Sequence, residues 1–198
     1  MPVTVTTDPI TTPRTTYRSS VPFETAESRL RSTIQREKNA APVTEIATAK
    51  APVFETRESF TKFIQSRIGE HGFMHFHEFN HGTWLQAYYP EISGVTGPDG
   101  NTKHLRSIRF ILGNPLIAQT MLRHDLNTGL SVPIELLLSE EVDGSAKIVQ
   151  FRPSGLIAGY EGAPEELGKA ARILDGKAEA LINWVLRDTG ADEPKGNL

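Results

Sequence analysis

The sequence predicts an α+β fold, with a mainly antiparallel sheet, helices packed on one face of it, an N-terminal arm and a C-terminal helix. Alternating apolar residues in 106–112, 132–138 and 146–151 indicate three half-buried strands. An Asp-Gly turn joins the last two segments, which favours an antiparallel hairpin. Apolar residues at helical spacing in 60–68 and 164–187 indicate amphipathic helices that bury one side against the sheet.

The N-terminal part of the chain has the composition of an arm. Six of the 13 prolines lie in the first 52 residues, and Met1–Ser20 is rich in threonine without a sustained apolar period. Residues 1–51 are therefore expected to be largely irregular. The exception is a short helix at Thr25–Lys38 with Leu30 and Ile34 on one side, a thin apolar stripe that needs to dock on another element to persist.

A single α+β domain is expected over residues 52–190, followed by a tail at 191–198. Glycine, proline and capping residues mark the ends of its segments. In chain order, the expected elements are an edge strand at Pro52–Glu55, a helix around 60–68, a strand at Phe73–Phe79, a short helix at Thr83–Tyr89, a loop at Glu91–Lys103, a strand at Arg106–Leu112, a helix capped by Asn114 with Pro115 at its first position, a hairpin of Val132–Leu138 and Ala146–Phe151, and the C-terminal helix at 164–187.

Composition excludes several classes of protein. The chain has 21 lysine and arginine residues and 24 aspartate and glutamate residues, and the resulting net charge of −3 argues against a nucleic-acid partner. No segment approaches the roughly 18 consecutive apolar residues of a membrane-spanning helix, so no membrane partner is expected. Because the chain has no cysteine, disulfides and thiolate chemistry are excluded. These features are typical of a cytoplasmic protein.

Three segments carry a family resemblance through their order and spacing. They are Gly72-Phe73 followed by Glu78-Phe79-Asn80-His81, then Phe110-Ile111-Leu112-Gly113-Asn114-Pro115, then Leu130-Ser131-Val132-Pro133-Ile134 followed by Asp143-Gly144. Over roughly residues 52–153 the chain resembles the family known as domain of unknown function 302. The resemblance implies a small, commonly dimeric α+β domain with a mainly antiparallel sheet and no established chemistry. His81 stands at the family's histidine, whereas Leu112 and Asn80 replace its usual phenylalanine and aspartate.

The histidines of one predicted strand form a candidate metal site. If Phe73–His81 is a regular strand, alternation places His75, His77 and His81 on one face, a spacing that can chelate a divalent transition metal. Glu78 then points to the opposite face. The alternative is that these imidazoles are surface or half-buried polar residues. The cofactor therefore stays open between none and a transition metal.

His81 has a second candidate role, as a catalytic acid–base group. Histidine is suited to this role because its unperturbed pKa lies near 6.5. The alternative is structural: the His81 ring caps the turn that follows at Gly82.

The preferred functional hypothesis is a domain that binds a small-molecule ligand. We expect its pocket between the strand at Phe73–His81 and the helices that cover it. The candidate ligand-binding residues are His75, His77, Trp84, Tyr88, Arg109 and Asn114. One alternative is a small metabolic enzyme of the isomerase, cyclase or lyase type that uses histidine or metal-assisted chemistry. The other is an interaction module that forms a homodimer through its C-terminal helix.

Overall fold

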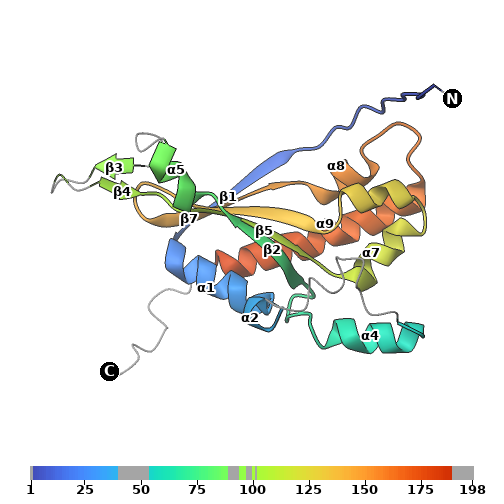
Figure 1. Ribbon diagram of the computed structural model, residues 1–198, viewed down its shortest axis with the longest axis horizontal. Coiled ribbons are helices and arrows are strands. Elements are labelled where there is room, and N and C mark those ends of the chain that lie inside the picture. Colours follow the sequence, from blue (N-terminus) through green and yellow to red (C-terminus); the bar gives the residue numbers. More distant parts are fainter. Residues whose placement is uncertain (1, 40–53, 89–93, 97–99, 101, 189–198) are drawn as a thin grey trace.

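A five-stranded antiparallel sheet forms the centre of the computed structural model, which describes residues 2–39, 54–88, 94–96, 100 and 102–188 (Figure 1). The strand order is β1-β7-β6-β5-β2, and a separate two-stranded hairpin pairs β3 with β4. The predicted α+β class is thereby confirmed. The strands are β1 (Arg14–Pro22), β2 (Met74–Asn80), β3 (Gly94–Thr96), β4 (Thr102–His104), β5 (Ser107–Gly113), β6 (Ile134–Glu140) and β7 (Ser145–Phe151).

The helices follow the predicted periodicities closely. They are α1 (Phe23–Thr33), α2 (Arg36–Asn39), α4 (Arg57–Gln65), α5 (Gly82–Tyr88), α7 (Pro115–Leu122), α8 (Pro153–Ala158) and α9 (Glu165–Val185), with a 3-10 turn, η1, at Leu126–Leu130. The sequence did not predict α8 or η1. No helix in the described part of the chain is long and apolar enough to cross a membrane.

Two segments differ from their predicted structure. The predicted loop at Glu91–Lys103 contains β3 and, with one residue beyond the loop, β4; this short hairpin had no apolar alternation that could reveal it. Of the predicted edge strand at Pro52–Glu55, the first two residues lie outside the described residues. Phe54 and Glu55 are not in a strand and lead instead into α4.

Local signals at helix ends and turns are confirmed. The Thr56 side chain accepts a hydrogen bond from the Ser59 backbone N–H at the start of α4. The Asn114 side chain caps α7, whose first residue is Pro115. In the β6–β7 turn, Gly144 has φ +86°, a left-handed conformation in which glycine carries no steric penalty.

The main core lies on one face of the sheet. Alternate residues of the central strands are buried there, among them Phe110 of β5, Leu136 of β6 and Ile148 of β7. Helices α1 and α9 cover this face, and both lie on the same side of the sheet in Figure 1. Seven residues of α9 are buried at helical spacing: Leu167, Ala171, Leu174, Ala178, Leu181, Ile182 and Val185. The predicted apolar stripe of the C-terminal helix is therefore real.

The predicted N-terminal arm is irregular only at residues 2–13; residues 14–39 form a strand and two helices, and residues 40–51 lie outside the described residues. Residues 14–22 form β1, an edge strand paired with β7 in the register Thr16 to Val149. The chain then enters α1, where Phe23, Ala26 and Leu30 are fully buried. The error has a physical cause. An edge strand buries only part of its surface, so its composition stays polar, and its pairing partner lies near the other end of the sequence.

A buried carboxylate ties α1 to the sheet. The Glu140 side chain is fully buried and accepts hydrogen bonds from Lys103 and from Arg106 Nε at 2.8 Å. Arg106 also reaches Glu24 in the first turn of α1, at 2.7 Å. Burial alone raises the pKa of Glu140, but the hydrogen bonds from Arg106 and Lys103 outweigh it and lower the pKa to about 2.

This carboxylate makes stability depend on pH under acid conditions. Because its pKa is lower in the folded state than the usual 4.5, the stabilisation is complete above about pH 5 and is lost as the pH falls towards 2. The full contribution is about 3 kcal/mol by linkage. In urea unfolding between pH 5.5 and 2.5, Glu140→Gln should flatten the pH slope, whereas Glu58→Gln on the exposed side of α4 should keep it. A Glu140→Gln slope equal to that of the wild type would contradict the assignment.

The N-terminal residues should contribute strongly to stability. Phe23 is fully buried, and the Arg106 guanidinium lies 4.2 Å from the centroid of its ring. Phe23→Ala should therefore lower the free energy of unfolding by about 3–5 kcal/mol. Val5 is 81% exposed, so Val5→Ala should stay within about 0.5 kcal/mol of the wild type. A near-neutral Phe23→Ala in denaturant melts would show that this segment does not belong to the core.

Candidate functional site

A β-bulge in β2 decides which way its histidines point. His75 pairs with Leu112 of β5 but His77 pairs with Ile111, so Phe76 is one extra residue in β2. Cross-strand partners share a face, and Leu112 is a core residue. His75 therefore points to the helix-covered face, and His77 points to the opposite face. The predicted common face for these two histidines is wrong, because strict alternation fails at a bulge.

The three predicted metal ligands do not converge. His77 packs edge-on against Phe79 with ring centroids 4.7 Å apart, while the His75 ring lies beside Glu78 on the other face. His81 follows the end of β2 and packs against Trp84. In the part of the chain that the structure describes, no group of three or more histidine, aspartate or glutamate residues could hold a metal ion.

His75 instead is a buried member of a partly exposed ionic cluster between β2 and helices α1 and α2. Its side chain is 7% exposed, both ring nitrogens are buried without a hydrogen-bond partner, and Nε2 lies 3.5 Å from Glu78 Oε2. Arg31 Nη1 of α1 donates to Glu78 at 2.6 Å, and Arg36 Nε of α2 lies 3.5 Å from the same carboxylate oxygen. Burial raises the pKa of Glu78, but both guanidinium groups lower it and leave it below its usual value.

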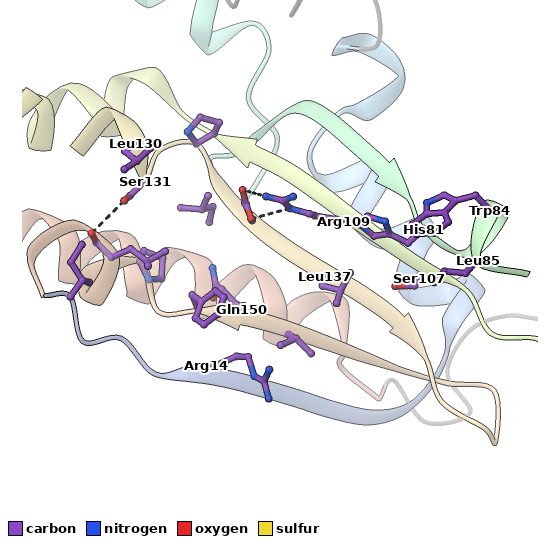
Figure 2. Close-up of a pocket in the computed structure, with 18 residues that line it drawn as sticks. Arg14, His81, Trp84, Leu85, Ser107, Arg109, Leu130, Ser131, Leu137 and Gln150 are labelled. Carbon is purple, nitrogen blue, oxygen red and sulfur yellow. Dashed lines mark hydrogen bonds and ion pairs between the residues drawn. The ribbon is translucent and has the colours of Figure 1, made fainter. Parts of the chain in front are cut away.

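A cavity lies where the sheet splits. Pairing between β6 and β7 runs from Glu140 with Ala146 only as far as Leu137 with Val149. Beyond that pair, β6 stays with β5 and β7 stays with β1, so the two halves of the sheet diverge (Figure 2). Pro133 precedes β6 and Pro153 follows β7, and proline has no N–H with which to extend a ladder.

This split-sheet cavity has a volume of about 750 Å³ and a mainly apolar lining. Strands β5, β6 and β7 contribute side chains, and α5, α8 and the segment before β6 form its rim. The lining residues are Ile10, Arg14, His81, Trp84, Leu85, Ser107, Arg109, Leu130, Ser131, Pro133, Ile134, Glu135, Leu137, Val149, Gln150, Phe151, Pro153 and Leu156. This cavity does not lie where the ligand pocket was predicted, between the strand at Phe73–His81 and the helices that cover it.

His81 and Trp84 lie together at one end of the cavity (Figure 2). The His81 backbone N–H donates to the Ser107 carbonyl at 2.8 Å, which fixes the start of α5 against β5. The turn after β2 is capped by Asn80, whose side-chain oxygen accepts from the Thr83 backbone N–H at 3.3 Å. The cap therefore comes from Asn80 rather than from the imidazole, and the His81 ring faces Trp84 at 6.0 Å between centroids.

An ion pair crosses the middle of the cavity wall. Arg109 Nε of β5 donates to Glu135 Oε2 of β6 at 2.9 Å, and a second hydrogen bond joins Arg109 Nη2 to Glu135 Oε1. Both side chains are partly exposed, at 40% and 50%. Because the Arg109 guanidinium and the Glu135 carboxylate neutralise each other, the pair adds little net charge to the cavity wall. Arg109 lines the cavity, but its guanidinium is engaged by Glu135.

Gln150 is a lining residue that sequence reasoning missed. It sits near the end of β7, is 6% exposed, and its side-chain nitrogen is buried without a hydrogen-bond partner. A buried amide donor without a partner is costly, so a polar residue at this position needs an explanation. The sequence feature that could have identified Gln150 is a break in the apolar alternation of β7. Ala146 and Ile148 are inward-facing apolar residues, and the polar Gln150 occupies the next inward position.

Two other predicted ligand-binding residues lie elsewhere. Tyr88 is 72% exposed and does not line the split-sheet cavity, although its ring is 6.4 Å from that of Trp84. Asn114 caps α7 and lines a smaller cavity on the other side of Pro133. The predicted set is therefore divided: the structure brings His81, Trp84 and Arg109 together and leaves the others outside.

Comparisons with known proteins identify the same family that the motifs indicate. Residues 52–181 match the family model described as domain of unknown function DUF302. A crystal structure of an uncharacterized conserved DUF302 protein from Bacillus stearothermophilus superposes with a TM-score of 0.54 at 17% sequence identity, covering 88% of this chain and 98% of that one. At this identity the likeness concerns the fold alone. The curated proteins contain no match to the sequence.

The buried His75 should make the protein less stable as the pH falls below neutrality. Burial is the main cause that lowers its pKa below 6.5; Glu78 opposes this effect, and Arg36 and Arg31 add to it. The unfolded chain therefore takes up the proton first, so stability is complete above about pH 6.5 and declines below it.

Chemical unfolding at pH 7.5 and 5.5 measures this effect. His75→Leu should reduce the loss of stability between the two pH values, whereas His124→Leu, at an exposed position after α7, should leave it unchanged. If His75→Leu loses as much stability as the wild type over this interval, the buried imidazole is not the group responsible.

Proposed function

We propose that this chain, which belongs to the DUF302 family of domains of unknown function, binds a small organic anion with an apolar body in its split-sheet cavity. The observation that carries the proposal is Gln150, a buried amide without a protein partner in the wall of a mainly apolar cavity. Binding of a ligand that bears a hydrogen-bond acceptor would satisfy this group.

The size and lining of the cavity support a ligand of metabolite dimensions. Pockets that bind small molecules usually measure about 300–1,000 Å³ and combine apolar walls with a few polar groups. The cavity of about 750 Å³ lies within this range. Leu137, Val149 and Leu156 supply apolar surface, and Trp84 offers a flat aromatic face at one end. These residues favour a ligand with an aromatic ring or a branched hydrocarbon body.

Charge favours an anionic head group. Arg14 enters the cavity wall from the first residue of β1, and no ion pair joins it to a carboxylate among the described residues. Its guanidinium presents up to five N–H donors in a planar fork that matches a carboxylate. Arg14 pairs with Phe151 and shares its face of the sheet, so Arg14 is the proposed anchor for the head group. Gln150 is an inward position of β7, so its amide is the proposed donor to a ligand acceptor that reaches between the diverging strands.

Catalysis is the second candidate function, and His81 is the observation that favours it. The imidazole lines the cavity without serving as the turn cap, which supports an acid–base role towards a ligand bound there. An isomerase, cyclase or lyase would use it as the acid–base group. Turnover that disappears in His81→Gln would support this alternative, whereas recovery of an unchanged ligand from the wild type supports binding alone. Homodimer formation stays a prediction.

Isothermal titration with 4-phenylbutyrate tests the binding proposal. Gln150→Leu keeps the size of the side chain but removes its hydrogen bonds, so the affinity should fall by about tenfold or more. The same variant should be as stable as the wild type or slightly more stable, because it removes an unpaired buried amide. Gln65→Leu, on the exposed side of α4, is the matched control and should change neither property.

A second variant tests whether the Arg14 guanidinium binds the carboxylate of the ligand. Arg14→Gln should weaken 4-phenylbutyrate but leave the uncharged analogue 4-phenyl-1-butanol unaffected, because only the carboxylate loses its partner. Equal affinities of the wild type, Gln150→Leu and Arg14→Gln for 4-phenylbutyrate would overturn the proposed site.

A further inference from the structure

A second cavity lies between α4, α7 and the segment that leads into β6. Its volume is about 360 Å³, and its walls include Phe60, Phe76, Ile117, Met121, Val132 and Leu174. We call it the α7 cavity. It shares the lining residues Pro133 and Ile134 with the split-sheet cavity, so the two cavities lie on either side of the same short segment.

The bulge in β2 helps to build this cavity. Phe76 is the extra residue between the two histidine pairs, and its side chain joins the wall beside Phe60 of α4. At the end of β5, a Cβ added to Gly113 would come within 2.9 Å of the Pro133 Cβ. Glycine therefore allows β5 to approach Pro133 closely, and this contact closes one side of the cavity.

The polar side chains of the α7 cavity are already engaged. Asn114 Oδ1 accepts from the Leu116 N–H at 2.8 Å, and Asn114 Nδ2 donates to the Gly72 carbonyl at 2.9 Å. Gln119 Nε2 donates to the Leu116 carbonyl at 3.2 Å. The lining contains no charged residue. A charged ligand would therefore lose its hydration here without gaining a partner.

We infer that the α7 cavity is a second binding site, specific for an uncharged hydrocarbon group such as a phenyl ring or a short alkyl chain. An apolar cavity of about 150 Å³ suffices to bind benzene, so about 360 Å³ leaves room for a ring with a short chain. Binding places the hydrocarbon group in dispersion contact with the aromatic and aliphatic walls. The site thus has the opposite charge preference to the split-sheet cavity.

Methionine methyl groups provide a local readout of this site. The chain has three methionines: Met121 lines the α7 cavity, Met74 is buried beside Ile64, and Met1 is at the N-terminus. In protein labelled with ¹³C at the methionine methyl groups, 4-phenyl-1-butanol should shift the Met121 resonance saturably, because its ring binds next to that methyl group. The carboxylate analogue 4-phenylbutyrate should be at least about tenfold weaker by the same readout at pH 7.5.

Variants separate this site from the proposed split-sheet site. Ala118→Phe places a ring in the α7 cavity and should abolish the Met121 response to the alcohol, whereas Ala180→Phe on the exposed side of α9 should preserve it. Gln150→Leu should also preserve it, since that residue lines only the other cavity. The Met74 resonance reports whether each variant is folded.

The wild-type titration alone is decisive. A Met121 resonance that does not move with 4-phenyl-1-butanol, or that responds equally to the alcohol and the carboxylate, overturns the inference. Either result leaves the test of Gln150 and Arg14 with 4-phenylbutyrate intact, so the two proposals fail independently.

Discussion

One-sided burial of the sheet is the constraint on which the rest of the structure depends. Phe110, Leu136 and Ile148 face α1 and α9, and these two helices form the main core with the sheet. The opposite face is left to shorter elements at its rim, so aromatic side chains such as Phe79 and Phe151 remain about half exposed there. The helix-covered face of the sheet therefore holds the main core, while the opposite face remains partly accessible to solvent.

The divergence of β6 and β7 turns that uncovered face into a cavity. Strand pairing ends at Leu137 and Val149, and prolines at positions 133 and 153 limit the ladder on both strands. In a regular sheet, β6 and β7 would continue to pair through backbone hydrogen bonds beyond this point. The split instead leaves the Gln150 amide in the cavity wall without a protein partner, a cost that a ligand acceptor would offset.

A single extra residue in β2 has three consequences. It turns His75 towards Glu78 and the guanidinium groups of α1 and α2, it leaves His77 on the other face beside Phe79, and it supplies Phe76 to the α7 cavity. The bulge thus separates the histidines that a regular strand would bring together. The α7 cavity that Phe76 lines shares Pro133 and Ile134 with the split-sheet cavity, so the two cavities lie on either side of this segment.

The sequence by itself determined the features that depend on a few neighbouring residues: the alternation of β5, the Asn114 cap, the Asp143-Gly144 turn and the apolar stripe of α9. It also predicted His81, Trp84 and Arg109 as candidate site residues, and all three line the split-sheet cavity. Tertiary structure alone decided the pairing of β1 with β7, the directions of His75 and His77, and the position of Gln150 in the wall of a cavity. The physical reason is that propensity, capping and periodicity act within one or two turns of chain. Strand register, bulges and the point where two strands part are set by contacts between residues far apart in the sequence.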